Sequence, residues 1–176
     1  PYTLRAADHF ECADRIRALF SRLIGADDPL RIALIPAVSY GMAIVAANLH
    51  CWPGLHTKKH IVLIGEEFPN NVYAFDLVCA AQGLEVVTVE KPETPDSRGA
   101  EWNARLLEVI TPETALVVTP QVHWIYGTVF NLEAVGRRCR EVGAMLAVDA
   151  TQSVGAMPFD VQTIRPDAVI CAAYKW

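Results

Sequence analysis

Short apolar runs alternate with amphipathic segments along most of the chain, and this alternation is the feature that most limits the fold. The apolar runs predict strands at residues 31–35, 60–64, 85–89, 115–118, 145–148 and 168–171. Helical spacing of apolar residues predicts helices at residues 8–24, 39–49, 71–82, 102–109 and 132–142. Continuous apolar strands separated by helices are typical of a mostly parallel sheet covered on both faces. We therefore expect a three-layer α/β fold.

The composition argues against several classes of partner. The 176 residues are 52% hydrophobic, which is enough for a sizeable core, and the length fits one domain. A net charge of −5 without long runs of one sign disfavours nucleic acid and anionic membranes. No apolar run reaches the length of a membrane span, and the first residues lack the features of a signal peptide. A cytoplasmic protein is the default expectation.

Five cysteines are scattered through the chain without a CxxC pair. Their odd number and mostly apolar surroundings predict buried free thiols in a reducing compartment, and no metal site. These residues are Cys12, Cys51, Cys79, Cys139 and Cys171.

The residues that follow each predicted strand are the candidates for chemistry, because ligands in open α/β sheets bind beyond the carboxyl ends of the strands. Ser39 and Tyr40 begin a predicted helix, where exposed amides and hydroxyls form a site for phosphate. The alternative is that Ser39 simply caps the helix. Phe68 follows the second predicted strand and could stack on a planar ligand or pack in the core.

Other residues at predicted strand ends carry weaker signals. His123 could titrate near neutral pH and Trp124 could flank a ligand, but a packed loop that contains both is an equal alternative. Glu66 and Glu67 could suggest acid–base work, yet adjacent side chains diverge and a solvated loop explains them more simply. We assign these two glutamates no role.

The strongest pairing in the sequence joins the ends of two apolar runs. Asp149 ends one run, and Lys175 follows another run 26 positions later. An acid at such a place is costly to bury without a partner, for example a protonated ring nitrogen. A lysine amine can form a Schiff base with an aldehyde cofactor, and the Gln152 amide can donate to a phenolic oxygen. Together they point to pyridoxal 5'-phosphate (PLP), with a turn cap as the alternative for Asp149.

These segments, in this order, resemble the class V aminotransferase family. The resemblance covers nearly the whole chain and rests on residues 39–41, 68–71, 145–155 and 167–176. It implies a PLP-dependent enzyme of fold-type I. The family includes cysteine desulfurases, selenocysteine lyases, kynureninases and isopenicillin-N epimerase-like enzymes. The resemblance also implies an amino-acid substrate and a homodimer with active sites at the subunit interface.

The resemblance implies a role for each matching residue. Lys175 would form the Schiff base and, once released, move the α-proton of the substrate. Asp149 would pair with the pyridine nitrogen of PLP, and Gln152 with its phenolic oxygen. Ser39 and Tyr40 would bind the phosphate at the helix start.

Three positions depart from the desulfurase pattern. Phe68 falls where desulfurases place a stacking His that also takes part in proton transfer, which Phe cannot do. Trp124 falls where desulfurases commonly have an Asn that contacts the cofactor. Tyr174 falls where they usually have His, and matches a position that reaches the phosphate in kynureninase-like members. The kynureninase-like or epimerase-like branch is therefore favoured over a cysteine desulfurase or selenocysteine lyase.

Family members extend beyond both ends of this sequence. The resemblance thus implies that residues 1–176 form most of a PLP-binding large domain, with a small C-terminal domain and the flanking segments outside it. The alternative class is a non-catalytic phosphate-binding α/β domain with Lys175 at its surface, although the usual phosphate-loop motifs are missing. A degenerate relative without catalysis is a third reading.

Overall fold

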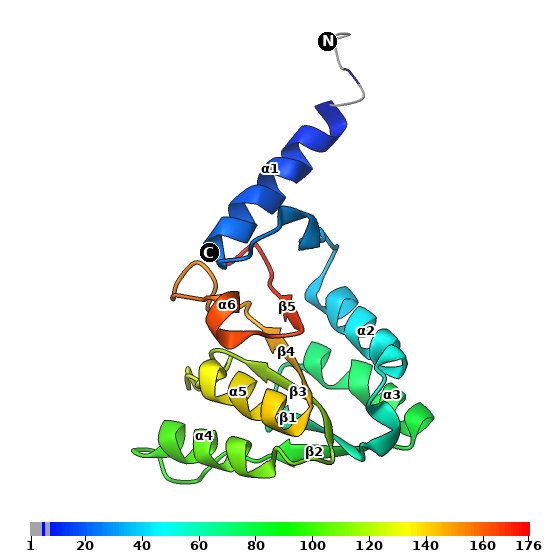
Figure 1. Cartoon of the computed structure of the whole chain (residues 1–176). Coiled ribbons are helices and arrows are strands. Elements are labelled where there is room, and N and C mark those ends of the chain that lie inside the picture. Colours follow the sequence, from blue (N-terminus) through cyan, green and yellow to red (C-terminus); the bar gives the residue numbers. More distant parts are fainter. Residues whose placement is uncertain (1–4, 6–7) are drawn as a thin grey trace.

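The computed structural model describes residue 5 and residues 8–176 (Figure 1). In this part of the chain, five strands form one sheet in the order β2-β1-β3-β4-β5, and all adjacent strands are parallel. The strands are β1 (His60–Ile64), β2 (Glu85–Val89), β3 (Thr114–Pro120), β4 (Met145–Asp149) and β5 (Ala168–Ile170). The predicted parallel sheet is confirmed, and five of the six predicted strands lie in it.

Helices cover both faces of the sheet, as the sequence predicts (Figure 1). One face packs against α2 (Val38–Asn48) and α3 (Tyr73–Gln82). The other face packs against α4 (Arg98–Val109), α5 (Leu132–Val142) and α6 (Val161–Ile164). The remaining helix is α1 (Asp8–Leu23), and short 3₁₀ turns occur at η1 (Pro29–Arg31), η2 (Leu49–Cys51), η3 (Leu55–Thr57) and η4 (Pro69–Asn71).

The strands feed two hydrophobic cores, one on each face of the sheet. In β1, Val62 and Ile64 pack toward α4 and α5, whereas Ile61 and Leu63 pack toward α2 and α3. All seven residues of β3, the middle strand, are buried. A strand buried on both faces reads as a continuous apolar run, which is why β3 was visible in the sequence.

Glycines fix two kinds of local geometry in the helices. Gly83 and Gly143 end α3 and α5 in the left-handed region, with φ of 68° and 65°. Gly136, inside α5, is needed for close packing, because a Cβ there would lie 2.1 Å from the carbonyl oxygen of Ile164. The helix α5 therefore lies directly against α6.

Two predictions about the fold are wrong, and one helix was missed. Residues 31–35 form no strand, because they lie outside the sheet and the Ile32 carbonyl oxygen accepts from Arg17 Nε at 3.1 Å instead of from a strand. Cys12 and Cys51 are exposed rather than buried, although all five cysteines are free. The helix α6 has four residues, too few to show helical periodicity in the sequence.

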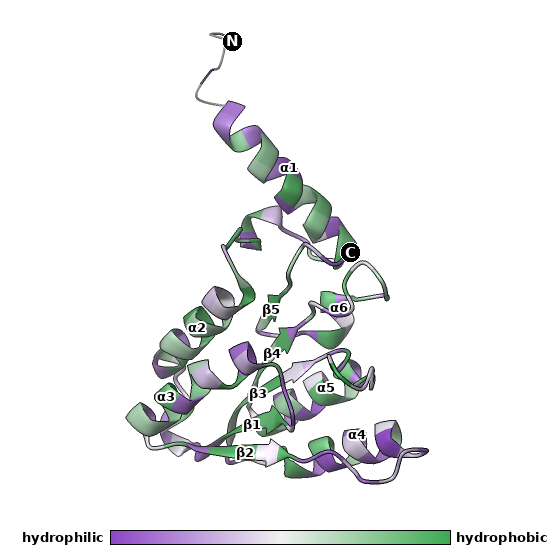
Figure 2. Ribbon diagram, turned by 180° about the vertical axis from the view of Figure 1, so that it is seen from behind, coloured by the Kyte–Doolittle hydropathy of each residue, from purple (hydrophilic) through white to green (hydrophobic). Residues whose placement is uncertain are grey.

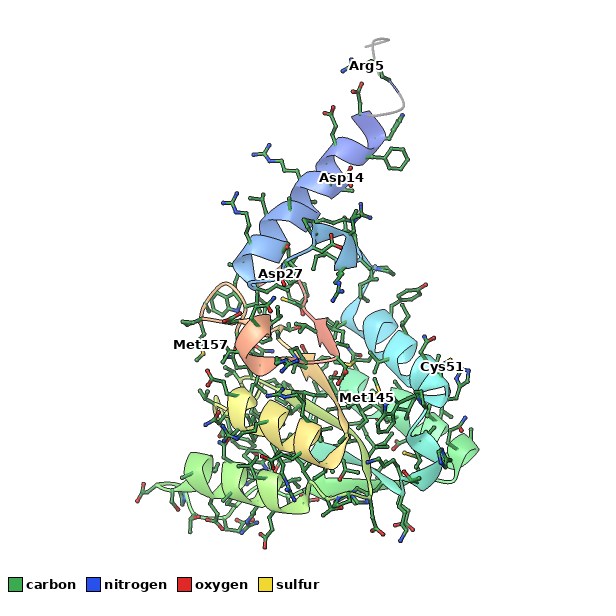
Figure 3. All side chains as sticks on the ribbon, viewed as in Figure 1. Arg5, Asp14, Asp27, Cys51, Met145 and Met157 are labelled. Atoms are coloured by element: carbon green, nitrogen blue, oxygen red, sulfur yellow. The ribbon has the colours of Figure 1, made fainter. Side chains whose placement is uncertain are left out.

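The helix α1 projects away from the sheet (Figure 1), and side chains such as Asp14 point outward from it (Figure 3). Green hydrophobic residues run along α1 between purple hydrophilic ones in Figure 2. Its Phe10, Ile16, Leu19 and Leu23 side chains are 45–64% exposed. Within the described residues, no helix combines the length and the apolar character that crossing a membrane requires.

Candidate active site

A pocket opens beyond the carboxyl ends of β1, β3 and β4. Its lining includes Phe68, Trp124, Asp149, Gln152, Tyr174 and Lys175. The strand that follows β1 in the sequence, β2, lies on one side of β1 in the sheet. The next strand, β3, lies on the other side of β1, so the strand order reverses there. Such a switch in strand order is where open α/β sheets bind ligands. The empty volume of the pocket is about 410 Å³, which includes space that is open to solvent.

Asp149, the last residue of β4, lies at the bottom of this pocket and is 8% exposed. Its Oδ1 accepts a hydrogen bond from the Thr151 amide, and its Oδ2 accepts one from Asn71 Nδ2, both at 3.0 Å. A carboxylate has about four lone-pair sites, so Asp149 can accept further hydrogen bonds from a ligand. Two hydrogen bonds therefore hold the Asp149 side chain, which can still accept another from a ligand.

Lys175 reaches the same pocket from the segment after β5. Its Nζ donates to Gln152 Oε1 at 2.8 Å. The Ala172 amide donates to Thr151 Oγ1 at 3.1 Å, which ties this segment to the turn after β4. The structure thus brings together Asp149, Gln152 and Lys175, as the sequence predicts.

Phe68 and Trp124 form an aromatic wall of the pocket. Their ring centroids lie 5.2 Å apart in an edge-to-face arrangement, and the Trp124 Nε1 donates to the carbonyl oxygen of Glu66 at 2.8 Å. Phe68 is 39% exposed and Trp124 is 43% exposed. Both rings can therefore contact a planar ligand, and the core reading of Phe68 is wrong.

His123 lies in a packed loop, which is the second of the two interpretations that the sequence left open for it. It is 1% exposed, its Nε2 lies 3.2 Å from the carbonyl oxygen of Gly65, and its Nδ1 accepts from the amides of Ile125 and Tyr126. Burial lowers the pKa of His123, so the neutral ring is favoured. The neutral ring satisfies these contacts with its proton on Nε2.

Val38, the first residue of α2, lines the pocket, so the start of this helix lies at the pocket's edge. The N-cap of α2 is Ala37, which makes no side-chain cap bond, so the reading of Ser39 as the cap is wrong. Ser39 is exposed and Tyr40 is 53% exposed, and neither belongs to the pocket lining. Tyr174 does line the pocket, with an exposed fraction of 81%.

The sequence reading missed Glu67. Adjacent side chains diverge, as expected, but only Glu66 points to the surface, where it contacts the Tyr126 hydroxyl and lies 3.7 Å from Lys91 Nζ. Glu67 turns into the pocket and is 8% exposed, so the solvated-loop reading is wrong for it. The only signal in the sequence was its place after a strand and before the aromatic Phe68.

Burial raises the pKa of Glu67 to about 7; the hydrogen bond from the Phe68 amide, at 2.7 Å, opposes this rise, and the charge of Asp149 adds to it. Two buried oxygens beside Asp149 accept no hydrogen bond from protein groups, Glu67 Oε2 and Asn71 Oδ1. The pocket thus holds a second carboxyl group next to Asp149.

A parallel sheet covered by helices on both faces is the fold of PLP enzymes of fold-type I. The model of the family described as aminotransferase class-V matches residues 4–176. The chain belongs to this family.

Two curated relatives illustrate the range of the family. The cysteine desulfurase IscS of Glaesserella parasuis serovar 5 (strain SH0165) is 31% identical over 166 residues, which cover 94% of this chain and 39% of that protein. Kynureninase 1 of Phaeosphaeria nodorum (strain SN15) is 26% identical over 174 residues, which cover 93% of this chain and 32% of that protein. The chain thus spans less than half the length of these relatives.

The fold is also that of a solved structure of C-DES, a cystine C-S lyase. The structure of a C-DES mutant with glycine covalently linked to the PLP cofactor matches with a TM-score of 0.82 and 24% sequence identity. The match covers 100% of this chain and 45% of that chain.

Proposed function

We propose that the full-length protein is a PLP-dependent enzyme that acts on an amino acid, with Lys175 as the residue that carries the cofactor. The observation that supports it most is that Asp149, Gln152 and Lys175 meet in one pocket, with Lys175 Nζ 2.8 Å from Gln152 Oε1. Membership of the aminotransferase class-V family supports it independently.

The residues of the pocket fit the ring of PLP. Asp149 has acceptor capacity for a protonated pyridine nitrogen, in a charge-assisted hydrogen bond. The side-chain amide of Gln152 is a donor for the phenolic oxygen. Phe68 and Trp124 offer ring contact and exclude water from one side of the pocket.

The start of α2 fits the phosphate of PLP. Its first amides are not occupied by a side-chain cap, and the partial positive charge of a helix N-terminus favours an anion. Ser39 and Tyr40 would add hydroxyl donors there, and Tyr174 would add a third from the rim of the pocket. Because Ser39 and Tyr40 do not line the pocket, their side chains would have to turn toward the phosphate.

Bound PLP supplies an electron sink for negative charge at the α-carbon of an amino acid. The residues of this chain supply the rest. Lys175 Nζ provides the covalent attachment and, when free, takes or returns the proton at the α-carbon. Asp149 favours a charged ring nitrogen because an adjacent anion stabilises a cation.

The reaction we favour is of the kynureninase-like or epimerase-like kind. The aromatic wall of Phe68 and Trp124 offers no ionisable group for a second proton transfer, and we assign the proton at the α-carbon to Lys175. A cysteine desulfurase or selenocysteine lyase is the second candidate, and the 31% identity to a cysteine desulfurase favours it. Release of sulfide from cysteine separates the two.

We also propose that the protein is a cytoplasmic homodimer, in which residues 1–176 form most of the PLP-binding domain. Two-fold dimers are the commonest closed assembly, and free cysteines suit a reducing compartment. Light scattering should give the mass of a dimer. A monomer that binds PLP tightly and turns over would contradict the proposal.

A spectroscopic titration tests the central proposal. PLP added to the full-length protein should give a visible absorption band of a lysine Schiff base. Lys175→Ala should give none, whereas Lys59→Ala, which alters a surface lysine paired with Glu113, should keep it. A wild-type protein that gives no band would favour the non-catalytic phosphate-binding domain.

A further inference from the structure

The buried side chain of Glu67 has an unusual hydrogen-bonding environment. Its Oε1 accepts from the Phe68 amide at 2.7 Å, but its Oε2 has no partner. Nearby, Asn71 is 0% exposed and donates from Nδ2 to Asp149 Oδ2 at 3.0 Å, while its own Oδ1 has no partner. The Asn71 side chain lies within hydrogen-bonding reach of Glu67 and lowers its pKa, against the larger rise that burial causes. Two buried oxygens are thus left over in one group of three side chains.

Glu67 Oε2 and Asn71 Oδ1 are both hydrogen-bond acceptors when Glu67 is ionised. Neither can satisfy the other in that state, and an unsatisfied buried polar atom is costly. A proton on Glu67 Oε2 changes this, because a neutral carboxylic acid can donate and an amide oxygen can accept. One proton therefore satisfies both atoms.

We propose that Glu67 is held as a neutral carboxylic acid in the folded protein, and that its O–H donates to Asn71 Oδ1 and so keeps the Asn71 amide on Asp149. Glu67 is then a positioning residue that acts on Asp149 through Asn71. Its effect on the cofactor rests on the proposed function, whereas its protonation state does not.

The charged groups around Glu67 agree with this assignment. Asp149 lies on β4 and opposes a second negative charge in the pocket. Lys175 shares the pocket, but its Nζ is bound to Gln152 Oε1. The other titratable neighbours are Tyr174 on the rim, Glu66, which is paired at the surface with Tyr126 and Lys91, and His123, whose pKa is lowered by burial.

Ionisation of Glu67 should loosen Asp149. An ionised carboxylate cannot donate to Asn71 Oδ1, and it competes with Asp149 for the Nδ2 donor of the same amide. Since the pKa of Glu67 is raised to about 7, this change falls in the neutral range. The hold on Asp149 is therefore strong on the acid side of neutrality and weaker on the alkaline side.

Infrared spectroscopy of the cofactor-free protein tests the protonation state directly. At pH 6 the wild type should show the carbonyl stretch of a neutral carboxylic acid, and Glu67→Gln should lose it. Glu66→Gln is the matched control, because the carboxyl group of Glu66 is adjacent in sequence but lies at the surface. This variant should keep the band. Identical spectra for the wild type and Glu67→Gln at pH 6 would overturn the proposal.

Binding of pyridoxine 5'-phosphate tests the positioning role. This probe lacks the aldehyde, so Lys175 cannot trap it covalently, and Trp124 in the pocket wall can report its binding by fluorescence. At pH 6, Glu67→Gln should bind as the wild type does, since an amide can also donate to Asn71, and Glu67→Ala should bind roughly tenfold more weakly, as expected for loss of a buried hydrogen bond. Above pH 7, the wild type should weaken relative to Glu67→Gln.

The outcomes separate the two proposals. Equal binding by all three proteins at every pH would overturn the positioning role. A wild type that does not bind the probe at all would contradict the proposed function, and the infrared result would still decide whether Glu67 is neutral. If Glu67→Ala does not fold, the comparison of Glu67→Gln with the wild type across pH decides the positioning role.

Discussion

The polar floor and the rim of the pocket differ in how firmly the protein holds them. We define the floor as Glu67 and Asp149, which line the pocket and are each 8% exposed, together with the fully buried Asn71, which donates to Asp149. We define the rim as Phe68, Trp124, Tyr174 and Lys175, which are exposed. The floor is fixed before a ligand arrives, whereas the rim is free to adapt to one.

This difference assigns different work to the two regions. Floor residues come from the segment after β1 and from the end of β4, and hydrogen bonds hold them. A substitution there changes the polar groups that a ligand meets. Rim side chains are exposed to the pocket, so a substitution there removes a contact or a bond to the ligand.

The largest effect should come from the rim, at Lys175. Lys175→Ala removes the only pocket-lining amine in the described residues, so covalent attachment of PLP and turnover should both be lost. The fold should persist, because the Lys175 side chain is exposed and its one side-chain hydrogen bond is to Gln152. Absorption spectra, turnover and thermal unfolding measure these three properties. Turnover at wild-type rates would contradict the assignment.

The next largest effect should come from the floor, at Asp149. Asp149→Asn is nearly isosteric but cannot match a carboxylate as the partner of a charged ring nitrogen. We expect turnover to fall by about 100-fold or more, as when a charge-stabilising contact in the transition state is removed. Steady-state kinetics measure the loss, and an unchanged melting temperature shows that the fold is intact. A variant with nearly full activity would exclude this role.

Smaller effects should follow from the aromatic part of the rim, at Phe68. Its ring contact beyond burial is worth roughly 0.5–1.5 kcal/mol, so Phe68→Ala should weaken PLP binding by at least about 2–10-fold. Phe68→His should keep PLP bound and change its spectrum, because it restores an ionisable ring.

The same residue decides the branch of the family. With Phe68 in place, the unmodified full-length protein should release little or no sulfide from cysteine, since the aromatic wall carries no group for proton transfer. A sulfide assay with cysteine as substrate measures this. Robust sulfide production would restore the cysteine desulfurase reading.

The smallest expected effect is on stability and comes from the floor, at Glu67. Its pKa is raised in the folded protein from the ordinary 4.5 to about 7, so the folded state binds more protons than the unfolded state between these values. The free energy of unfolding should therefore fall as the pH rises from 4.5 to 7. Glu67→Gln should make this part of the profile flatter in thermal or urea unfolding. A parallel profile for the variant would mean that Glu67 titrates normally.

The sequence predicted the elements whose pattern is local. The buried strands β1, β3 and β4 read as apolar runs, and α5 shows clear helical spacing before Gly143. Residues 31–35 look like another strand because they are apolar, but pairing in a sheet depends on long-range neighbours that a local pattern does not contain. The same limit explains the exposure of Cys12 and Cys51.

The sequence pointed to those pocket residues whose type is unusual at the end of an apolar run. Asp149 and Lys175 follow apolar runs, and their chemistry is distinctive. Glu67 was missed because its role depends on the direction of its side chain: Glu66 lies at the surface, whereas Glu67 faces the pocket. The orientation of a side chain beyond a strand end is a tertiary property.

Mapping the cofactor adduct identifies the lysine that carries PLP. Borohydride should reduce the Schiff base of the PLP-loaded full-length protein to a stable amine, and peptide mass analysis should then locate the adduct. We expect it on Lys175. The other lysines are held elsewhere: Lys58 Nζ donates to the Pro112 and Val142 carbonyl oxygens, Lys59 pairs with Glu113, and Lys91 lies beside Glu66. An adduct on Lys58, Lys59 or Lys91, with none on Lys175, would contradict the account.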